Sequence, residues 1–220
     1  MEKNLEFNTE SYVTQSQRWP SDGKHILAQY TDDYVIVYRA FNKDIADYAV
    51  RNQKFGGNSY KMDRTSWIKT NFLWMMYRSQ WATRHINQEH ILAIYLTVEG
   101  FEEILSNAYS TEIQQQEGLA RREVPIRLQW YADKDPQGES QVRRAIQLAI
   151  KPKMMKDFHE KWIIGIRDVT EFVQQQRQFI ENNEFENLVC PSEKIYVPRN
   201  QNTAVRITLA HWAKSRLSRN

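Results

Sequence analysis

The chain has 220 residues, of which 41% are hydrophobic and 26% charged, and its formal net charge is +3. These values are typical of a globular protein with one substantial domain or two small ones. The single cysteine excludes an intramolecular disulfide, and the N-terminus lacks the apolar core of a signal peptide. No apolar run approaches the roughly 20 residues of a membrane span. We therefore expect a cytoplasmic protein without a membrane contact.

The first third of the chain predicts one clear strand and one clear helix. Residues 1–17 are polar and are expected to form a flexible segment, followed by a turn at 19–23 and a short helix over 24–30. The β-branched and aromatic run Tyr34–Tyr38 is typical of a strand. Asn42 is a suitable N-cap for a helix through Val50, which Gly56 and Gly57 would end.

Three tryptophans then recur every seven residues, at 67, 74 and 81. Thr70 or Asn71 can cap a helix over 72–82, which would place Trp74 and Trp81 on one face with Arg78 between them. Because this helix is apolar nearly all round, a buried core helix is the first interpretation. Aromatic residues interleaved with cations also fit a base-stacking surface or a nucleotide pocket, and these alternatives remain open.

The remaining pattern alternates strands with helices. Strands are expected over 90–96, 125–131, 144–150 and 194–197, and helices over 98–108, 154–162 and 169–180, with Thr97 as the cap of the first. Together these elements predict an α+β protein: a single mixed-sheet domain over 18–198 with flanking helices. Along the strand after Pro125, Gln129 is expected on the face opposite Trp130.

A basic segment, 199–220, follows the predicted domain. No acidic residue occurs after Glu193, whereas Lys194, Arg199, Arg206, Lys214, Arg216 and Arg219 follow. Such a segment can hold nucleic acid by releasing counterions from its phosphates. A solvated terminus that only aids solubility is the plainer alternative.

Standard cofactor and metal motifs are absent from the sequence. It has neither a glycine-rich dinucleotide fingerprint nor a phosphate-binding loop. The turn at 133–138 begins like a calcium loop, but Arg144 stands where the loop needs a glutamate. No histidine or cysteine cluster has the spacing of a metal site, so no metal is expected.

Several blocks together resemble the domain-of-unknown-function family 4291. They are Val37-Tyr-Arg-Ala-Phe, Ile45-Ala-Asp-Tyr-Ala-Val, Phe55-Gly-Gly, Arg64-x-x-Trp-Ile-Lys, the block from Phe72 to Ala82, Ile91-Leu-Ala-Ile and Arg127-Leu-Gln-Trp. The resemblance covers residues 15–198, and Trp-Met-Met-Tyr-Arg-Ser is its most specific part. It implies no activity.

A fainter likeness is to compact ADP-ribosyltransferases that modify nucleic acid. The order of elements along this chain is similar to theirs: a strand ending in Tyr38-Arg39, a helix, a glycine-containing loop and an aromatic block. The likeness implies NAD bound in a cleft of a split mixed sheet, with Arg39 and either Tyr77 or Trp74 holding the nicotinamide ribose and ring. A later glutamate orients the transition state in those enzymes, but here the candidate strands carry Gln129 and Gln147 instead.

The resulting hypothesis is an NAD-dependent, ADP-ribosyltransferase-like transferase with nucleic acid as its acceptor. Its catalytic candidates are Arg39, Tyr77 and Gln129, and its cofactor-binding candidates are Tyr38, Arg39, Lys69, Trp74 and Arg78. The alternatives are a non-catalytic nucleic-acid-binding module and a protein-interaction domain with an exposed tryptophan patch. Convergence of Arg39, Lys69, Arg78 and Gln129 on one concave pocket would favour the transferase.

Overall fold

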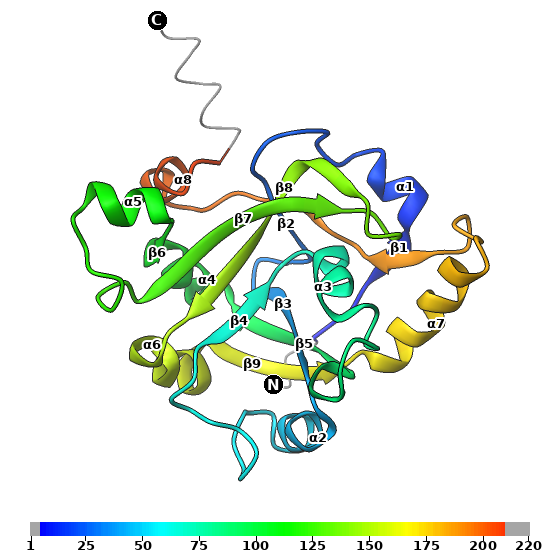
Figure 1. Cartoon of the computed structure of the whole chain (residues 1–220), viewed down its shortest axis with the longest axis horizontal. Coiled ribbons are helices and arrows are strands. Elements are labelled where there is room, and N and C mark those ends of the chain that lie inside the picture. Colours follow the sequence, from blue (N-terminus) through cyan, green and yellow to red (C-terminus); the bar gives the residue numbers. More distant parts are fainter. Residues whose placement is uncertain (1–4, 210–220) are drawn as a thin grey trace, which may run out of the picture.

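A seven-stranded mixed sheet forms the centre of the molecule (Figure 1), in a computed structural model that describes residues 5–209. Its strands, in spatial order, are β6 (Ala108–Tyr109), β7 (Ile126–Lys134), β8 (Ser140–Ile150), β4 (Ser66–Lys69), β3 (Tyr34–Phe41), β5 (His90–Thr97) and β9 (Ile163–Asp168). Only the β6–β7 pair is parallel. The predicted α+β class with one mixed sheet is therefore confirmed.

Two short antiparallel pairs join the beginning of the described chain to its end. Strand β1 (Thr9–Ser11) pairs with β10 (Val189–Pro191), and β2 (Ile26–Ala28) pairs with β11 (Lys194–Tyr196). The helix expected over 24–30 is thus wrong, because distant pairing with β11 determines this segment. Residues 9–16, expected within a flexible segment, form β1 and α1 (Tyr12–Ser16) for the same reason.

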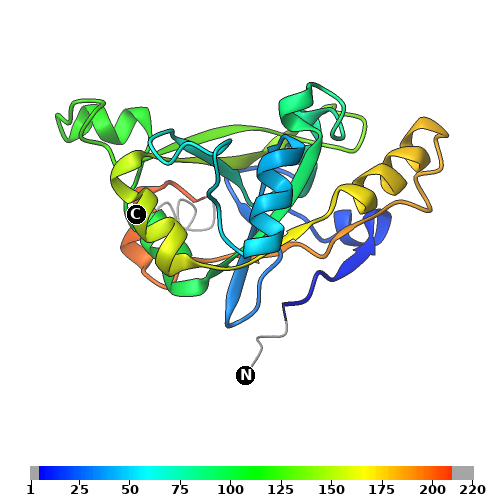
Figure 2. The same ribbon diagram turned by 90° about the horizontal axis from the view of Figure 1, so that it is seen from below.

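Helices contribute to a hydrophobic core on each face of the sheet. The first core contains residues of α2 (Lys43–Asn52), α4 (Val98–Ser106), α6 (Pro152–Asp157), its π-helical continuation η2 (Phe158–Trp162) and α8 (Gln201–Arg206). The second contains residues of α3 (Phe72–Ser79) and α7 (Thr170–Glu181). Helix α5 (Thr111–Gln116) and α7 lie at opposite ends of the molecule in both views (Figures 1 and 2).

Two helix starts follow the predicted capping chemistry. The side-chain oxygen of Asn42 accepts a hydrogen bond from the Ile45 amide at 3.0 Å, and that of Thr97 accepts one from Gly100 at 3.0 Å. Each bond satisfies an amide that has no partner within its own helix. Local sequence therefore determines where α2 and α4 begin.

Helix α3 ends at Ser79, three residues before the predicted end. Gln80, Trp81 and Ala82 all have positive φ angles, of 50°, 54° and 66°, so the chain turns out of the helix. The indole of Trp81 donates to the Pro136 carbonyl at 3.3 Å instead of sharing a helix face with Trp74. The heptad spacing is thus not a helical stripe: Trp67 lies in β4, Trp74 in α3 and Trp81 in the turn.

Strand β4 is not evident from the sequence, yet it joins the two halves of the sheet. On one side it pairs with β8 over all four of its residues, from Ser66 to Lys69. On the other side it pairs with β3 at a single position, Tyr38 opposite Lys69. Beyond this contact the two central strands are no longer paired, so the sheet is split.

The segment after residue 198 packs against the domain. Ala204 and Ile207 are buried in the first core. The Arg199 guanidinium lies 3.3 Å from the Glu99 carboxylate, and Arg206 donates to the Leu105 carbonyl at 3.3 Å. Three of the predicted nucleic-acid-binding cations, Lys214, Arg216 and Arg219, lie outside the described residues. Within 5–209, no helix has the length and hydropathy needed to cross a bilayer.

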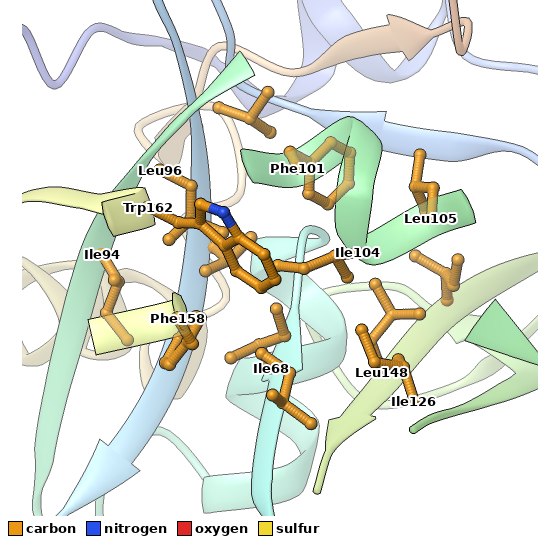
Figure 3. Close-up of a cluster of buried hydrophobic side chains, with 14 of the residues drawn as sticks. Ile68, Ile94, Leu96, Phe101, Ile104, Leu105, Ile126, Leu148, Phe158 and Trp162 are labelled. Carbon is orange, nitrogen blue, oxygen red and sulfur yellow. The ribbon is translucent and has the colours of Figure 1, made fainter. Parts of the chain in front are cut away.

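The first core closes tightly around Trp162. Its indole lies among Leu96, Phe101 and Ile104 (Figure 3), and it covers Gly100 of α4. A Cβ atom added at Gly100 would lie 2.5 Å from the Trp162 ring, well inside van der Waals contact. Glycine at this position therefore allows the close approach of α4 and η2.

We expect Gly100→Ala to destabilise the protein by about 1–2 kcal/mol, because an overpacking cost of about 2–3 kcal/mol outweighs the ~1 kcal/mol that alanine adds to helix propensity. Urea unfolding would measure the change in the free energy of unfolding. Gln174→Ala, on the exposed face of α7, is the control and should change that free energy by less than about 0.5 kcal/mol. Equal stability of Gly100→Ala and wild type would contradict the packing argument.

Candidate functional site

The split between β3 and β4 opens into a cleft of about 430 Å³. Strands β3, β4, β7 and β8, helix α3 and the 3₁₀ helix η1 (Ile86–Gln88) all contribute to it. Its lining residues are Arg39, Ala40, Trp67, Met75, Arg78, Asn87, Gln88, Gln129, Tyr131 and Gln147. Three predicted site residues, Arg39, Arg78 and Gln129, therefore meet in one cleft. The fourth, Lys69, does not line the cleft but is buried in register with Gln147, which does.

A polar row crosses three strands of the sheet at the cleft. Lys69 of β4 is in register with Gln147 of β8, and Gln147 is in register with Gln129 of β7. Successive residues of a strand point to opposite faces, so the neighbours of these three, including Ile68 and Leu148, belong to the first core. Gln129 accordingly lies on the face opposite Trp130, as predicted.

Arg39 is held by partners on both sides of the split. Its guanidinium donates hydrogen bonds to the Ser66 hydroxyl across the gap and to the Tyr60 side chain, and it lies 4.5 Å from the centre of the Phe41 ring. The Tyr60 hydroxyl also bonds His159 Nε2 at 3.1 Å. These contacts fix the position of the charge, while burial lowers the pKa of the guanidinium.

Lys69 is a buried amine without a carboxylate partner in residues 5–209. Its side chain is 6% exposed, and burial together with the Arg39 and Arg78 charges lowers its pKa to about 7. The amine therefore gains a full charge at neutral pH only if a negative group approaches it. Arg39 and Arg78 likewise form no ion pair with any acid in this range, and no acidic residue lines the cleft.

An aromatic stack supports one wall of the cleft. Tyr131, which lines it, stacks on Trp74 with ring centres 4.9 Å apart, and Trp74 stacks on Tyr77 at 5.4 Å. The Lys134 amine lies 4.1 Å from the centre of the Tyr77 ring. Trp74, 4% exposed, thus supports the lining but is not part of it.

Two further predicted residues lie outside the cleft lining. Tyr38 is fully buried in the second core, where its ring packs edge-on against Phe72 at 5.5 Å. Tyr77 lines another cavity of about 460 Å³ at the end of α3, together with Trp81 and Asp135. That cavity contains none of the other predicted site residues.

Buried acids hold α3 in place above the cleft. A side-chain oxygen of Glu193 accepts a hydrogen bond from the Phe72 amide at 2.6 Å, where the helix dipole favours negative charge. Burial raises the pKa of this carboxyl well above its usual range. Beside it, Arg143 Nε donates to Asp133 at 2.5 Å. The capping role expected of Thr70 or Asn71 thus falls to a residue more than a hundred positions away.

The comparisons with known proteins place the chain in a family. The model of a domain of unknown function, DUF4291, matches residues 25–196. The chain belongs to this family. The predicted resemblance to family 4291 is therefore correct, and the match includes every residue that lines the cleft. A search of curated proteins finds no match.

The cleft of this DUF4291 member gathers cations without carboxylates, an arrangement that suits an anion. Burying positive charge without a negative partner costs stability, which a bound phosphate or carboxylate would offset. The half-buried rings of Trp67 and Tyr131 add flat apolar surface, and Gln129 and Gln147 add hydrogen-bonding amides. No cluster of metal-ligating side chains occurs among residues 5–209.

Lys69 should make stability depend on pH. Because its pKa is about 7 in the folded protein, the unfolded chain binds the proton more tightly between pH 7 and about 10. The contribution of Lys69 to the free energy of unfolding of the wild-type protein should therefore rise with pH, by up to about 2 kcal/mol between pH 7 and 9. Lys69→Met should remove this rise in urea unfolding. Lys54→Met, at an exposed position, should retain it, and identical slopes for all three proteins would contradict the assignment.

Proposed function

We propose that the protein binds NAD in the cleft through its pyrophosphate and acts as an ADP-ribosyltransferase-like transferase. The observation that carries the proposal is the convergence of Arg39, Lys69 and Arg78, none of which has an acidic partner in residues 5–209. The cleft volume of about 430 Å³ lies within the usual range of ligand pockets, roughly 300–1,000 Å³.

The cations suit a pyrophosphate because they differ in geometry. Arg39 is fixed by Ser66 and Tyr60, so its planar fork can bind two phosphate oxygens at little entropic cost. Arg78 extends from the exposed side of α3. Lys69 would regain its proton beside the phosphate charge, which strengthens the contact. A phosphate therefore resolves the mutual repulsion of all three groups.

The remaining lining suits the other parts of a dinucleotide. Trp67 and Tyr131 present ring faces on which an adenine or nicotinamide can stack. The amides of Gln129 and Gln147 lie in register and can exchange hydrogen bonds with ribose hydroxyls. NAD would supply the ADP-ribosyl group: its bond to nicotinamide breaks, a bond to the acceptor nucleophile forms, and the acceptor proton is released.

The glutamate implied by the resemblance has no counterpart in the cleft lining. Gln129 and Gln147 can orient the ribose by hydrogen bonding but cannot stabilise a positive transition state as a carboxylate does. We therefore expect slow transfer, with binding more readily detected than turnover. Nucleic acid is the acceptor that the proposal favours, within a cytoplasmic setting.

Calorimetry with NAD tests the proposal directly. We expect the wild-type protein to bind NAD with a dissociation constant in the micromolar to millimolar range. Arg39→Ala should weaken the affinity at least tenfold, since a hydrogen bond to a charged partner contributes about 1.5–3 kcal/mol. Arg122→Ala removes an exposed charge that does not line the cleft and is the matched control. Absence of binding heat at millimolar NAD, or equal affinity in Arg39→Ala, would refute the assignment.

A nucleic-acid-binding module without catalysis is the second candidate. The partly exposed rings of Trp67 and Tyr131 favour it, because such rings stack on unpaired bases. An assay of nicotinamide release from NAD distinguishes the two functions. Chromatography would measure the release, with and without an oligonucleotide present. Binding of the oligonucleotide without NAD affinity would select the module.

A further inference from the structure

A second cavity adjoins the cleft on the side of α2. It measures about 290 Å³ and lies between the start of that helix and the loop before β4. Its lining residues are Arg39, Ala40, Phe41, Asn42, Ile45, Ser59, Tyr60, Lys61, Arg64 and Asn87. Three of these, Arg39, Ala40 and Asn87, also line the cleft, so the two hollows meet around the Arg39 side chain.

The charges of this second cavity have one sign. Arg39, Lys61 and Arg64 line it, and no acidic residue does. Asp63 lies between the two loop cations in sequence, yet neither Lys61 nor Arg64 forms an ion pair within residues 5–209. Both are exposed, whereas Arg39 is held from below by Ser66 and Tyr60. The cavity thus has one rigid cation and two solvent-exposed ones around a polar hollow.

We propose that this cavity binds a backbone phosphate of a single-stranded nucleic acid. A phosphodiester chain carries a charge at every nucleotide, so it can engage Lys61 and Arg64 together while its next nucleotide extends toward Arg39. The role of this strand as acceptor rests on the proposed function, because Arg39 would then contact both donor and acceptor. The shared chemistry is a phosphate ester, and a free mononucleotide is its other source.

Fluorescence anisotropy with a labelled single-stranded 12-mer tests the proposal. The double variant Lys61→Ala/Arg64→Ala should bind about tenfold more weakly at about 0.1 M salt. Its plot of log affinity against log salt should be shallower by about 0.7, the value for the one phosphate that the variant no longer neutralises. Lys153→Ala/Lys156→Ala removes the same charge from exposed positions of α6. This control pair should leave affinity and slope close to those of wild type.

Three outcomes would overturn the proposal. The first is an unchanged affinity of the cavity variant for the 12-mer, and the second is an equal loss of affinity in both double variants. The third is a similar loss of affinity for a labelled mononucleotide, which would show that the cavity binds a free nucleotide. All substituted side chains are exposed, so thermal unfolding should confirm intact folds. Retained binding of the 12-mer in Lys61→Glu/Arg64→Glu would count against it equally.

NAD calorimetry on the same variants separates this proposal from the proposed function. Lys61→Ala/Arg64→Ala should bind NAD as wild type does, because neither residue lines the cleft. If wild type binds the 12-mer as described but not NAD, the cavity remains a nucleic-acid site and the transferase fails. If NAD binds and the cavity variant retains the 12-mer, the transferase stands and the nucleic-acid site in the cavity fails.

Discussion

The single pairing of Tyr38 with Lys69 determines most of what is distinctive in this protein. It joins a β3–β5–β9 half of the sheet to a β4–β8–β7–β6 half, and elsewhere β3 and β4 are not paired with each other. A continuous ladder would have closed the space that Arg39 now spans to reach Ser66. The same pairing places Lys69 opposite Tyr38, on the face of the sheet that carries the second core, where its amine is buried. The cleft, the arginine that bridges it and the lysine with a lowered pKa all lie at this one point of the register.

The buried cations at the cleft reduce the stability of the fold. An apolar side chain in place of Lys69 would avoid the desolvation of an amine between two guanidinium groups. The surrounding structure compensates with buried interactions of its own, among them the Glu193 contact to α3 and the Asp133–Arg143 pair. Sites of ligand binding commonly depart from the arrangement that would be most stable.

Prediction from sequence succeeds where a few neighbouring residues decide the outcome. Apolar, β-branched and aromatic runs place β3, β5 and β8, alternation places β7, and side-chain capping places α2 and α4. Prediction fails where a distant partner determines the structure, as β11 does for β2. It also fails for β4, whose four residues are too few to show a periodic pattern and which is held by β8. For the site, residue type and position identify Arg39, Arg78 and Gln129. They also draw attention to Gln147, but they do not identify Trp67 and Tyr131 as lining residues, since only the pairing of β4, β8 and β7 brings these rings to the cleft.

The contact between Glu193 and α3 also constrains when the protein becomes functional during its synthesis. Glu193 caps α3, its carbonyl accepts from the Trp19 indole, and its amide donates to Gln15. The wall of the cleft, the first helix and the last strand are therefore linked by one residue near the end of the described chain. A nascent chain on the ribosome can form the antiparallel β3–β5 pair early, but it cannot complete the cleft until residue 193 has left the exit tunnel.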